Sequence, residues 1–332
     1  MTRLIQIANP GAGRRIALIQ SETAILLCGY ATAYDAAFAA VCERRPLEDL
    51  LASLPRESSL PYEDLWAGRS PWRLLVPFDH PAEPARCLVS GTGLTHLASA
   101  AARQQMHAAP GEETDSMRMY RWGVEGGRPP AGSIGAAPEW FYKGNGLILR
   151  AHGEPLEVPA YARGGGEEAE IAGVSLIAPD GAPRRVGMAA GNEFSDHQTE
   201  RLNYLYLAPS KLRQCSLGPE LAIGADFSLV PGAVTIERAG AVLWSKQIST
   251  GGQRMAHSLA NIEHHHFKHP QHRRPGDVHI HFYGADAFSS GAGVTLEDGD
   301  LMQISFDGFG RPLRNPLRVL PGPEIPVKAE AV

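Results

Sequence analysis

Two acidic residues stand two positions apart at the start of an apolar segment. Glu168 and Glu170 lead into residues 171–177, whose composition is typical of a core strand. Because side chains in a strand alternate between faces, the two carboxylates are expected to project from the same face. Like charges that close are unfavourable unless a positive charge lies between them. The pair therefore predicts a divalent cation with oxygen ligands, completed by a third carboxylate and by water or substrate.

A third acid follows the next apolar segment. Glu193 comes after residues 185–190, which are joined to the first segment by the turn-rich residues 179–183. Two strands joined by such a turn form a hairpin, and its second strand can bring Glu193 back toward Glu168 and Glu170. The alternative is that the first two acids belong to a solvent-facing strand edge, since carboxylates usually stay exposed.

The surrounding pattern predicts two units dominated by strands. Residues 4–28 are typical of short strands with a glycine-rich turn, and residues 34–45 have the apolar spacing of an amphipathic helix. We predict a small N-terminal α+β domain over 1–84 and a catalytic domain over 85–325. In the second domain we expect helices at 97–107, 196–204 and 253–266 and a hairpin of strands 301–306 and 313–319. The absence of βαβ alternation argues against a parallel Rossmann or barrel architecture.

Composition narrows the class of protein. The net charge of −5, with basic residues scattered along the chain, argues against a nucleic-acid partner. No early apolar run is long enough for a membrane span or a signal peptide, so we expect a cytoplasmic protein without a membrane partner. The cysteines lack CxxC spacing and are expected to be reduced, at positions Cys28, Cys42, Cys87 and Cys215.

Two further segments have more than one interpretation. Residues 108–137 carry apolar side chains that an active-site lid or a dimer arm would bury, although a surface loop fits equally well. The run 263–269 contains consecutive histidines, which point in different directions on a helix and so predict a solvated helix end rather than a metal site. His279 and His281 share a strand face, and one interpretation is that both are hydrogen-bonded core residues.

Taken in order, these motifs resemble the fumarylacetoacetate hydrolase-like superfamily. In that superfamily an ExE pair, a later acid and a lysine form a metal-dependent site for 2-keto acids. Glu168 and Glu170 match the pair, Glu193 stands where aspartate is usual, and Lys211 matches the lysine. The resemblance covers about residues 85–320. Further segments recur in the family's order, at 141–144, 155–159, 217–219, 249–250, 275–278 and 296–300.

The resemblance implies a fold, a cofactor and a pocket. The expected fold is α+β and strand-dominated, with a mixed β-roll or barrel catalytic domain and a small N-terminal α+β domain. The implied cofactor is Mg²⁺, with Mn²⁺ or Ca²⁺ as substitutes, held by Glu168, Glu170 and Glu193. The implied partners are a small-molecule 2-keto acid and a second copy of the chain. The implied substrate-binding residues are Lys143, Ser195, Thr250, His281, Tyr283 and Gly284.

Departures from the family pattern decide the predicted reaction. His197 replaces a common arginine, and His96 has Ser99 three positions later where hydrolases carry glutamate. A base without its orienting acid is a poor water activator. The pattern looks more like the branch that dehydrates 2-keto-3-deoxy sugar acids. We therefore predict dehydration of a pentonate such as 2-keto-3-deoxy-arabinonate through a metal-stabilised enolate, giving 2,5-dioxopentanoate.

The predicted catalytic residues are Lys211, His197, Glu200 and His96. Lys211 is the expected proton carrier, with a pKa lowered by burial and by the cation's field, or else a structural counter-charge to the glutamates. His197 and Glu200 are expected to form a second relay on one helical turn. Two other functions stay open. One is an acylpyruvate carbon–carbon hydrolase in which His96 finds its acidic partner elsewhere in the fold, and the other is a non-catalytic sugar-acid-binding protein.

Overall fold

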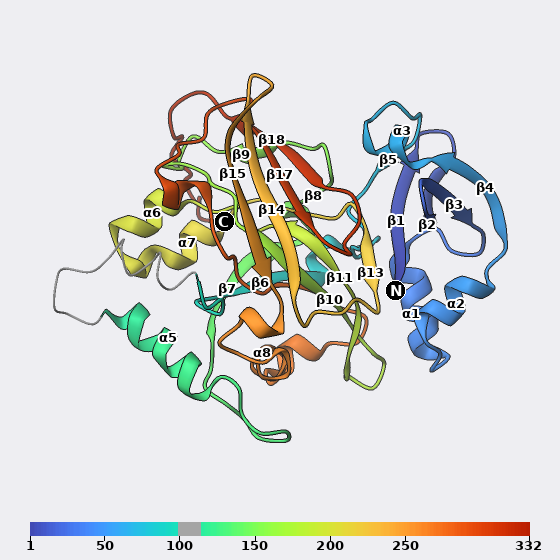
Figure 1. Ribbon diagram of the computed structural model, residues 1–332, viewed down its shortest axis with the longest axis horizontal. Coiled ribbons are helices and arrows are strands. Elements are labelled where there is room, and N and C mark those ends of the chain that lie inside the picture. Colours follow the sequence, from blue (N-terminus) through green and yellow to red (C-terminus); the bar gives the residue numbers. More distant parts are fainter. Residues whose placement is uncertain (99–113) are drawn as a thin grey trace.

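Two mixed sheets dominate the architecture, as Figure 1 shows. The computed structural model describes residues 1–98 and 114–332. One sheet has thirteen strands and the other has five, and helices lie around their edges. The strand-dominated α+β fold predicted from the sequence is therefore confirmed. Of the helix expected at 97–107, residues 99–107 lie outside the described residues.

The N-terminal region contributes one end of the larger sheet. Its elements are β1 (Thr2–Asn9), β2 (Gly13–Gln20), β3 (Thr23–Leu27), α1 (Ala33–Cys42), α2 (Leu47–Ser53), β4 (Arg56–Pro61), α3 (Tyr62–Trp66) and β5 (Arg73–Leu74). Helix α1 begins where Thr32 accepts a hydrogen bond from the backbone N of Asp35, which satisfies one of its free amides. Strand β1 pairs with β13 (Leu221–Ile223), so that the N-terminal strands and the main strands form one continuous sheet.

The rest of the larger sheet surrounds a fully buried strand, β10 (Ala169–Ile177). The other strands are β6 (Cys87–Gly93), β7 (Glu139–Asn145), β8 (Leu149–Arg150), β11 (Pro183–Asn192), β12 (Cys215–Leu217) and β16 (Val278–Phe282). Strands β10 and β11 form the predicted hairpin, with Glu170 opposite Gly191. This register returns Glu193 to the start of β10, where its backbone N donates to the carbonyl of Glu168.

The five-stranded sheet packs against one face of the larger sheet. It consists of β9 (Leu156–Val158), β14 (Val230–Arg238), β15 (Ala241–Thr250), β17 (Leu301–Phe306) and β18 (Leu313–Val319). A shared hydrophobic cluster joins the two sheets through Ile171, Val234 and Ile304. The hairpin of β17 and β18 confirms the one predicted from the sequence.

The helices of the main region are short. They are α5 (Asp115–Gly126), α6 (His197–Leu202), α7 (Leu207–Lys211) and α8 (Leu259–Phe267), with single turns at Pro84–Arg86, Gly146–Ile148, Tyr204–Tyr206, Gly252–Arg254, Pro270–Arg273 and Ser289–Ala292. Helix α8 begins later than predicted because the Ser258 side chain caps it by accepting from Asn261 N. None of these helices in the described part of the chain is long and apolar enough to cross a membrane.

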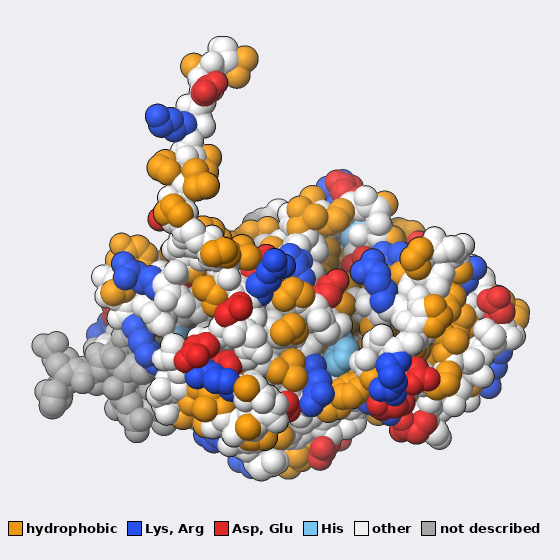
Figure 2. Space-filling view, turned by 90° about the horizontal axis from the view of Figure 1, so that it is seen from above, with side chains coloured by type: hydrophobic (Ala, Val, Ile, Leu, Met, Phe, Trp, Pro, Cys, Tyr) orange, Lys and Arg blue, Asp and Glu red, His pale blue; other side chains and the backbone are white. Residues whose placement is uncertain are grey.

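Two segments lie at the periphery. Helix α5 falls within the insertion predicted as a lid or arm, and its Trp122 and Val124 side chains are exposed. Residues 108–113 of that insertion lie outside the described residues. Residues 321–332 are exposed throughout and project from the body, as the space-filling view in Figure 2 shows.

Candidate metal centre and active site

Three carboxylates converge at one end of the β10–β11 hairpin. One oxygen from each of Glu168, Glu170 and Glu193 can be chosen so that all three lie within 4.8 Å of one another, and all three residues are buried. Glu168 and Glu170 come from the start of β10, and Glu193 follows the last residue of β11. The structure thus brings together the ligand set predicted from the sequence, because the hairpin register leaves no other place for Glu193.

Two buried lysines complete the group. The Nζ atom of Lys211 lies 2.5 Å from Glu168 Oε1 and 2.5 Å from Glu193 Oε2. Lys143 Nζ lies 2.5 Å from the other oxygen of Glu193 and donates to the carbonyl of Phe194. Both lysine side chains are fully buried. We refer to Glu168, Glu170, Glu193, Lys143 and Lys211 as the acid–lysine cluster.

Glu170 differs from the other two acids in its partners. One of its oxygens accepts a hydrogen bond from the backbone N of Gly284 at 2.7 Å, whereas the lysines bond Glu168 and Glu193. Burial, reinforced by the charges of Glu193 and Glu168, holds the pKa of the Glu170 carboxyl well above its usual range. Three carboxyl groups and two lysine side chains thus share one buried space.

This donor set fits a hard divalent cation. Carboxylate oxygens are the preferred ligands of Mg²⁺, Mn²⁺ and Ca²⁺, and a cation would relieve the repulsion among the three carboxylates, which adds to burial in raising the pKa of Glu170. Gly284 has φ of 107°, and a Cβ atom there would lie 2.4 Å from Thr95 Oγ1. A glycine at 284 therefore allows the backbone amide to reach Glu170.

His197 adjoins the acid–lysine cluster at the start of α6. Its Nε2 atom lies 2.9 Å from Glu168 Oε1, its Nδ1 atom lies 3.0 Å from Ser290 Oγ, and its ring stacks on Phe288. The helix begins there because Asp196 accepts from Thr199 N. Glu200 is buried one turn later on the same helix. The structure therefore places the predicted relay residue His197 in contact with a ligand of the predicted cation.

Glu167 is a site residue that the sequence analysis missed. Its carboxylate accepts hydrogen bonds from Ser289 N at 2.6 Å and from Ser289 Oγ at 2.7 Å. It thereby fixes the turn whose next residue, Ser290, contacts His197. Burial raises the pKa of this carboxyl. The signal available in the sequence was an acid directly beside Glu168, but its partner lies 122 positions away.

His96 lies close to an acid that the sequence analysis did not name. Asp286 Oδ1 is 4.0 Å from His96 Nδ1, and the other oxygen of Asp286 accepts from Ser249 N. However, His96 Nε2 donates to the carbonyl of Ser249 at 2.7 Å, and Nδ1 accepts from Ala98 N at 3.1 Å. Burial lowers the pKa of the His96 imidazole. Backbone groups therefore occupy both ring nitrogens.

The predicted substrate-binding residues divide between two faces of the sheet. Lys143 belongs to the acid–lysine cluster, Gly284 N bonds Glu170, and the Ser195 hydroxyl donates to Glu193 and accepts from Lys211. Thr250 has a buried hydroxyl with no hydrogen-bond partner among the described residues.

His281 and Tyr283 face away from the acid–lysine cluster. In the pairing of β10 with β16, His281 lies opposite Gly173 and its neighbour Phe282 lies opposite Ala172. Alternation then places His281 and Tyr283 on the face of Gly173 and Ser175, opposite to the face of Glu170. Their prediction as walls of the 2-keto acid pocket is therefore corrected, and the hydrogen-bonded core alternative describes His281, whose Nδ1 lies 2.8 Å from Ser90 Oγ.

A second buried polar group occupies that opposite face. Trp140 Nε1 donates to His266 Nδ1, and His266 Nε2 lies 2.9 Å from His279 Nδ1. His272 Nδ1 bonds the carbonyl of His266. Burial lowers the pKa of His279 and of His281 to about 3, so that both are neutral at physiological pH. We refer to Trp140, His266, His272, His279 and His281 as the histidine cluster.

The histidine cluster corrects one prediction for the run 263–269. His266 is buried on the same face of α8 as Ile262, whereas a solvated helix end was expected. His264 and His265 remain partly exposed, as predicted. Within the described part of the chain, the three glutamates are the one group whose geometry suits a metal ion.

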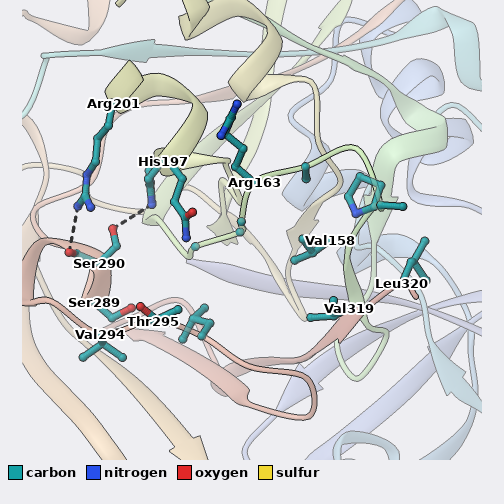
Figure 3. Close-up of a pocket in the computed structure, with 18 of the residues that line it drawn as sticks. Val158, Arg163, His197, Arg201, Ser289, Ser290, Val294, Thr295, Val319 and Leu320 are labelled. Carbon is teal, nitrogen blue, oxygen red and sulfur yellow. Dashed lines mark hydrogen bonds between the residues drawn. The ribbon is translucent and has the colours of Figure 1, made fainter. Parts of the chain in front are cut away.

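A cavity of about 340 Å³ lies beside His197 (Figure 3). His197 and Arg201 both point toward Ser290, and Val158, Val319 and Leu320 lie on the other side of the drawn pocket. None of the three glutamates lines this cavity. It therefore borders the acid–lysine cluster through His197 and is separate from the predicted cation position.

Solved structures with the same fold were found by structural comparison. A 2-keto-3-deoxy-D-arabinonate dehydratase complexed with magnesium and 2,5-dioxopentanoate aligns with a TM-score of 0.71 and 20% identity, over 96% of this chain and 99% of that chain. A 2-hydroxyhepta-2,4-diene-1,7-dioate isomerase from Mycobacterium marinum aligns with a TM-score of 0.58 and 18% identity, over 96% and 99%. A 5-carboxymethyl-2-hydroxymuconate delta-isomerase from Mycobacterium smegmatis gives 0.56 and 18%, over 96% and 100%.

These likenesses confirm the fold predicted from the motifs, which is the fumarylacetoacetate hydrolase-like fold. No protein-family model matches the sequence, and no curated protein sequence matches it. The evidence for function therefore comes from the geometry of the site.

Proposed function

We propose that this protein is a divalent-cation-dependent dehydratase of a 2-keto-3-deoxy sugar acid, a pentonate such as 2-keto-3-deoxy-arabinonate, with 2,5-dioxopentanoate as the product. The observation that carries the proposal is the acid–lysine cluster, in which three buried carboxyl groups share one space with the amino group of Lys211. The likeness to a dehydratase solved with magnesium and 2,5-dioxopentanoate supports the choice of substrate class.

Glu168, Glu170 and Glu193 would hold the cation. When bound, the cation would supply a Lewis acid that takes the carboxylate and keto oxygens of the substrate and makes the C3 protons more acidic. Lys143 contacts one oxygen of Glu193 and Lys211 contacts the other, and together they keep that carboxylate oriented. Gly284 N orients Glu170 in the same way.

Lys211 is the proposed proton carrier. Its Nζ atom lies at hydrogen-bond distance from two of the proposed ligands and from Ser195 Oγ, so a bound 2-keto acid would lie beside it. In the proposed reaction Lys211, as a neutral amine, takes the C3 proton, the electrons of the C3–H bond form a C3=C4 double bond, and the C4 hydroxyl leaves as water with the proton that Lys211 returns. A proton shift from C5 to C3 then gives the C4=C5 enol, and tautomerisation of this enol gives the dioxo acid. His197, bonded to Glu168, is placed to assist the proton return.

The arrangement of His96 argues against hydrolysis. A hydrolase needs a base with a free nitrogen to take a proton from water, and backbone groups occupy both nitrogens of His96. Asp286 is near this ring but is also bonded to Ser249 N. Asp286 is thus near enough to be the acidic partner that a hydrolase would need. His96, however, bonds backbone groups through both ring nitrogens, which is a structural arrangement.

The proposal is tested by incubating the protein with Mg²⁺ and either 2-keto-3-deoxypentonates or acylpyruvates, with products followed by NMR. We expect formation of 2,5-dioxopentanoate and slower or no cleavage of acylpyruvates. His96→Asn should lower dehydration less than tenfold, since general-base catalysis is worth about 10²–10⁴-fold only where the base acts. Faster cleavage of acylpyruvates than dehydration of any sugar acid would contradict the proposal.

A further inference from the structure

A larger cavity lies where the N-terminal region meets the main sheet. Its volume is about 620 Å³, which is in the range of small-molecule sites. The end of α1 and the connection to α2 form one wall, and the β10–β11 turn with the start of β11 forms the other. The lining residues are Ala37, Ala40, Val41, Cys42, Arg44, Arg45, Pro46, Leu47, Ala178, Pro179, Asp180, Arg184, Arg185 and Val186.

The cavity combines an apolar floor with a basic rim. Ala37, Ala40 and Val186 are buried, and Leu47 is half-buried beside them. Four arginines line the cavity, whereas Asp180 is the one acidic residue that does so within the described part of the chain. This composition gives an apolar surface with an excess of positive charge, which suits a ligand of the opposite sign.

Two of the four arginines already have acidic partners. Arg184 pairs with Asp180 at 3.3 Å, and Arg185 pairs with Glu263 of α8 at 2.6 Å. Arg45 donates to a neutral acceptor, the backbone carbonyl of Asp49. Neither Arg44 nor Arg45 forms an ion pair within residues 1–98 and 114–332. Two guanidinium groups at the rim are therefore available to an anion, and the guanidinium fork matches carboxylate and phosphate geometry.

The cavity is distinct from the acid–lysine cluster. Strand β10 begins beside Glu168 and ends at residue 177, next to the cavity wall at Ala178. Nine residues in a strand span about 30 Å at roughly 3.3 Å per residue. Strand β11 covers the same distance in the return direction, from the cavity wall to Asn192. A ligand in this cavity would thus contact the turn of the hairpin whose opposite end carries the three glutamates.

We propose that this cavity is a second binding site, and that it takes a small organic anion with an apolar body and one carboxylate or phosphate head group. The apolar body would lie on Ala37, Ala40, Leu47 and Val186, and the head group would lie at Arg44 and Arg45. Nothing in this proposal depends on the reaction assigned to the acid–lysine cluster.

The test uses the full chain and two ten-carbon probes that differ only in charge. Decanoate binding is measured by calorimetry at low salt, with decanol as the uncharged match. We expect decanoate to bind with one site per chain, to bind at least tenfold more tightly than decanol, and to weaken as ionic strength rises. Equal affinity for the two probes, or no decanoate binding, would overturn the proposal.

The head-group position is tested with a double substitution, Arg44→Gln with Arg45→Gln. We expect at least a tenfold loss of decanoate affinity. The matched control is Arg69→Gln with Arg73→Gln, because those arginines are exposed on the same N-terminal region but do not line this cavity. Circular dichroism establishes that both variants are folded. A folded Arg44/Arg45 variant that loses less than tenfold, or a control that loses as much, would overturn the assignment.

Discussion

Strands β10 and β16 separate two buried polar groups that differ in their donor sets. On one face the acid–lysine cluster gathers three carboxyl groups and two lysine side chains. On the other face the histidine cluster contains rings that bond one another and a backbone carbonyl. Both groups are buried, so burial alone does not mark function. The difference lies in the converging carboxyl groups, which suit a divalent cation and which the histidine cluster lacks.

The histidine cluster is joined by directional hydrogen bonds between ring nitrogens. Trp140 Nε1 can only donate, so His266 Nδ1 must accept and His266 Nε2 must carry the proton given to His279. This order fixes the tautomers of His266 and His279, and the Nε2 atoms of His279 and His281 have no hydrogen-bond partner among the described residues. In the acid–lysine cluster, burial, reinforced by two neighbouring carboxylates, raises the pKa of Glu170. A cation would relieve the repulsion between these carboxylates, whereas burial of His279 and His281 favours their neutral form and calls for no counter-charge.

The largest effect is expected from Lys211→Met. The substitution keeps most of the side-chain volume and removes the proposed proton carrier, so exchange of the substrate's C3 protons should fall by about 10²–10⁴-fold. The measurement is NMR in deuterated water with Mg²⁺ and a 2-keto-3-deoxypentonate. His281→Gln, on the opposite face, is the control and should change the rate less than tenfold. Exchange at the wild-type rate in Lys211→Met would show that the lysine is a structural counter-charge.

A large loss of stability is expected from Lys143→Met. Glu193 would keep a buried carboxylate with one ammonium partner in place of two, and breaking a buried ion pair typically costs about 3–5 kcal/mol. Urea unfolding without divalent cations measures this change in the free energy of unfolding, and added Mg²⁺ should reduce it. A change in the free energy of unfolding below about 1 kcal/mol would mean that Lys143 does not stabilise the buried carboxylate of Glu193.

The histidine cluster should make stability depend on pH. The pKa values of His279 and His281 are near 3 in the fold and 6.5 in the unfolded chain, so the unfolded state binds protons first as pH falls. The free energy of unfolding should therefore decrease from pH 6.5 downward and level off below the folded pKa. Between pH 6.5 and about 4.5 each ring contributes on the order of 2–3 kcal/mol. The double variant His279→Gln with His281→Gln should show a shallower slope, and an unchanged slope would contradict neutral burial.

The smallest effect is expected from Trp140→Phe. The variant removes the donor to His266 and should cost about 1 kcal/mol, the usual net value of one hydrogen bond, without altering dehydration. Urea unfolding with an activity assay measures both quantities. A loss of activity without a loss of stability would show that the two faces of the sheet are not independent.

Local patterns were sufficient to predict the elements that position the site. The apolar segments 171–177 and 185–190 and the turn at 179–183 predicted the β10–β11 hairpin, and the hairpin alone brings Glu193 to Glu168 and Glu170. Strand-face assignments across the sheet could not be made, because they depend on the register between β10 and β16, which are separated by about a hundred residues. That is why His281 and Tyr283 were predicted as candidate pocket walls, with a core position for His281 left as an open alternative.

Contacts with distant partners were also beyond local patterns. Glu167 bonds Ser289, and Asp286 bonds Ser249, and neither pair has a spacing that the sequence could reveal. The burial of His266 follows from how α8 packs on the sheet, which a run of histidines does not indicate. The convergence of the three glutamates was predictable because one hairpin supplies them, whereas the residues that hold the surrounding loops come from several elements.

Mg²⁺ binding measured by calorimetry tests most directly whether the acid–lysine cluster is a cation site. The measurement compares the wild type, Glu170→Gln and His281→Gln. The account predicts one site per chain in the wild type and in His281→Gln, and a loss of about 100-fold or more in Glu170→Gln, since even residues behind the ligands cost about 10–100-fold. Unchanged Mg²⁺ affinity in a folded Glu170→Gln variant, or no Mg²⁺ binding to the wild type, would contradict it.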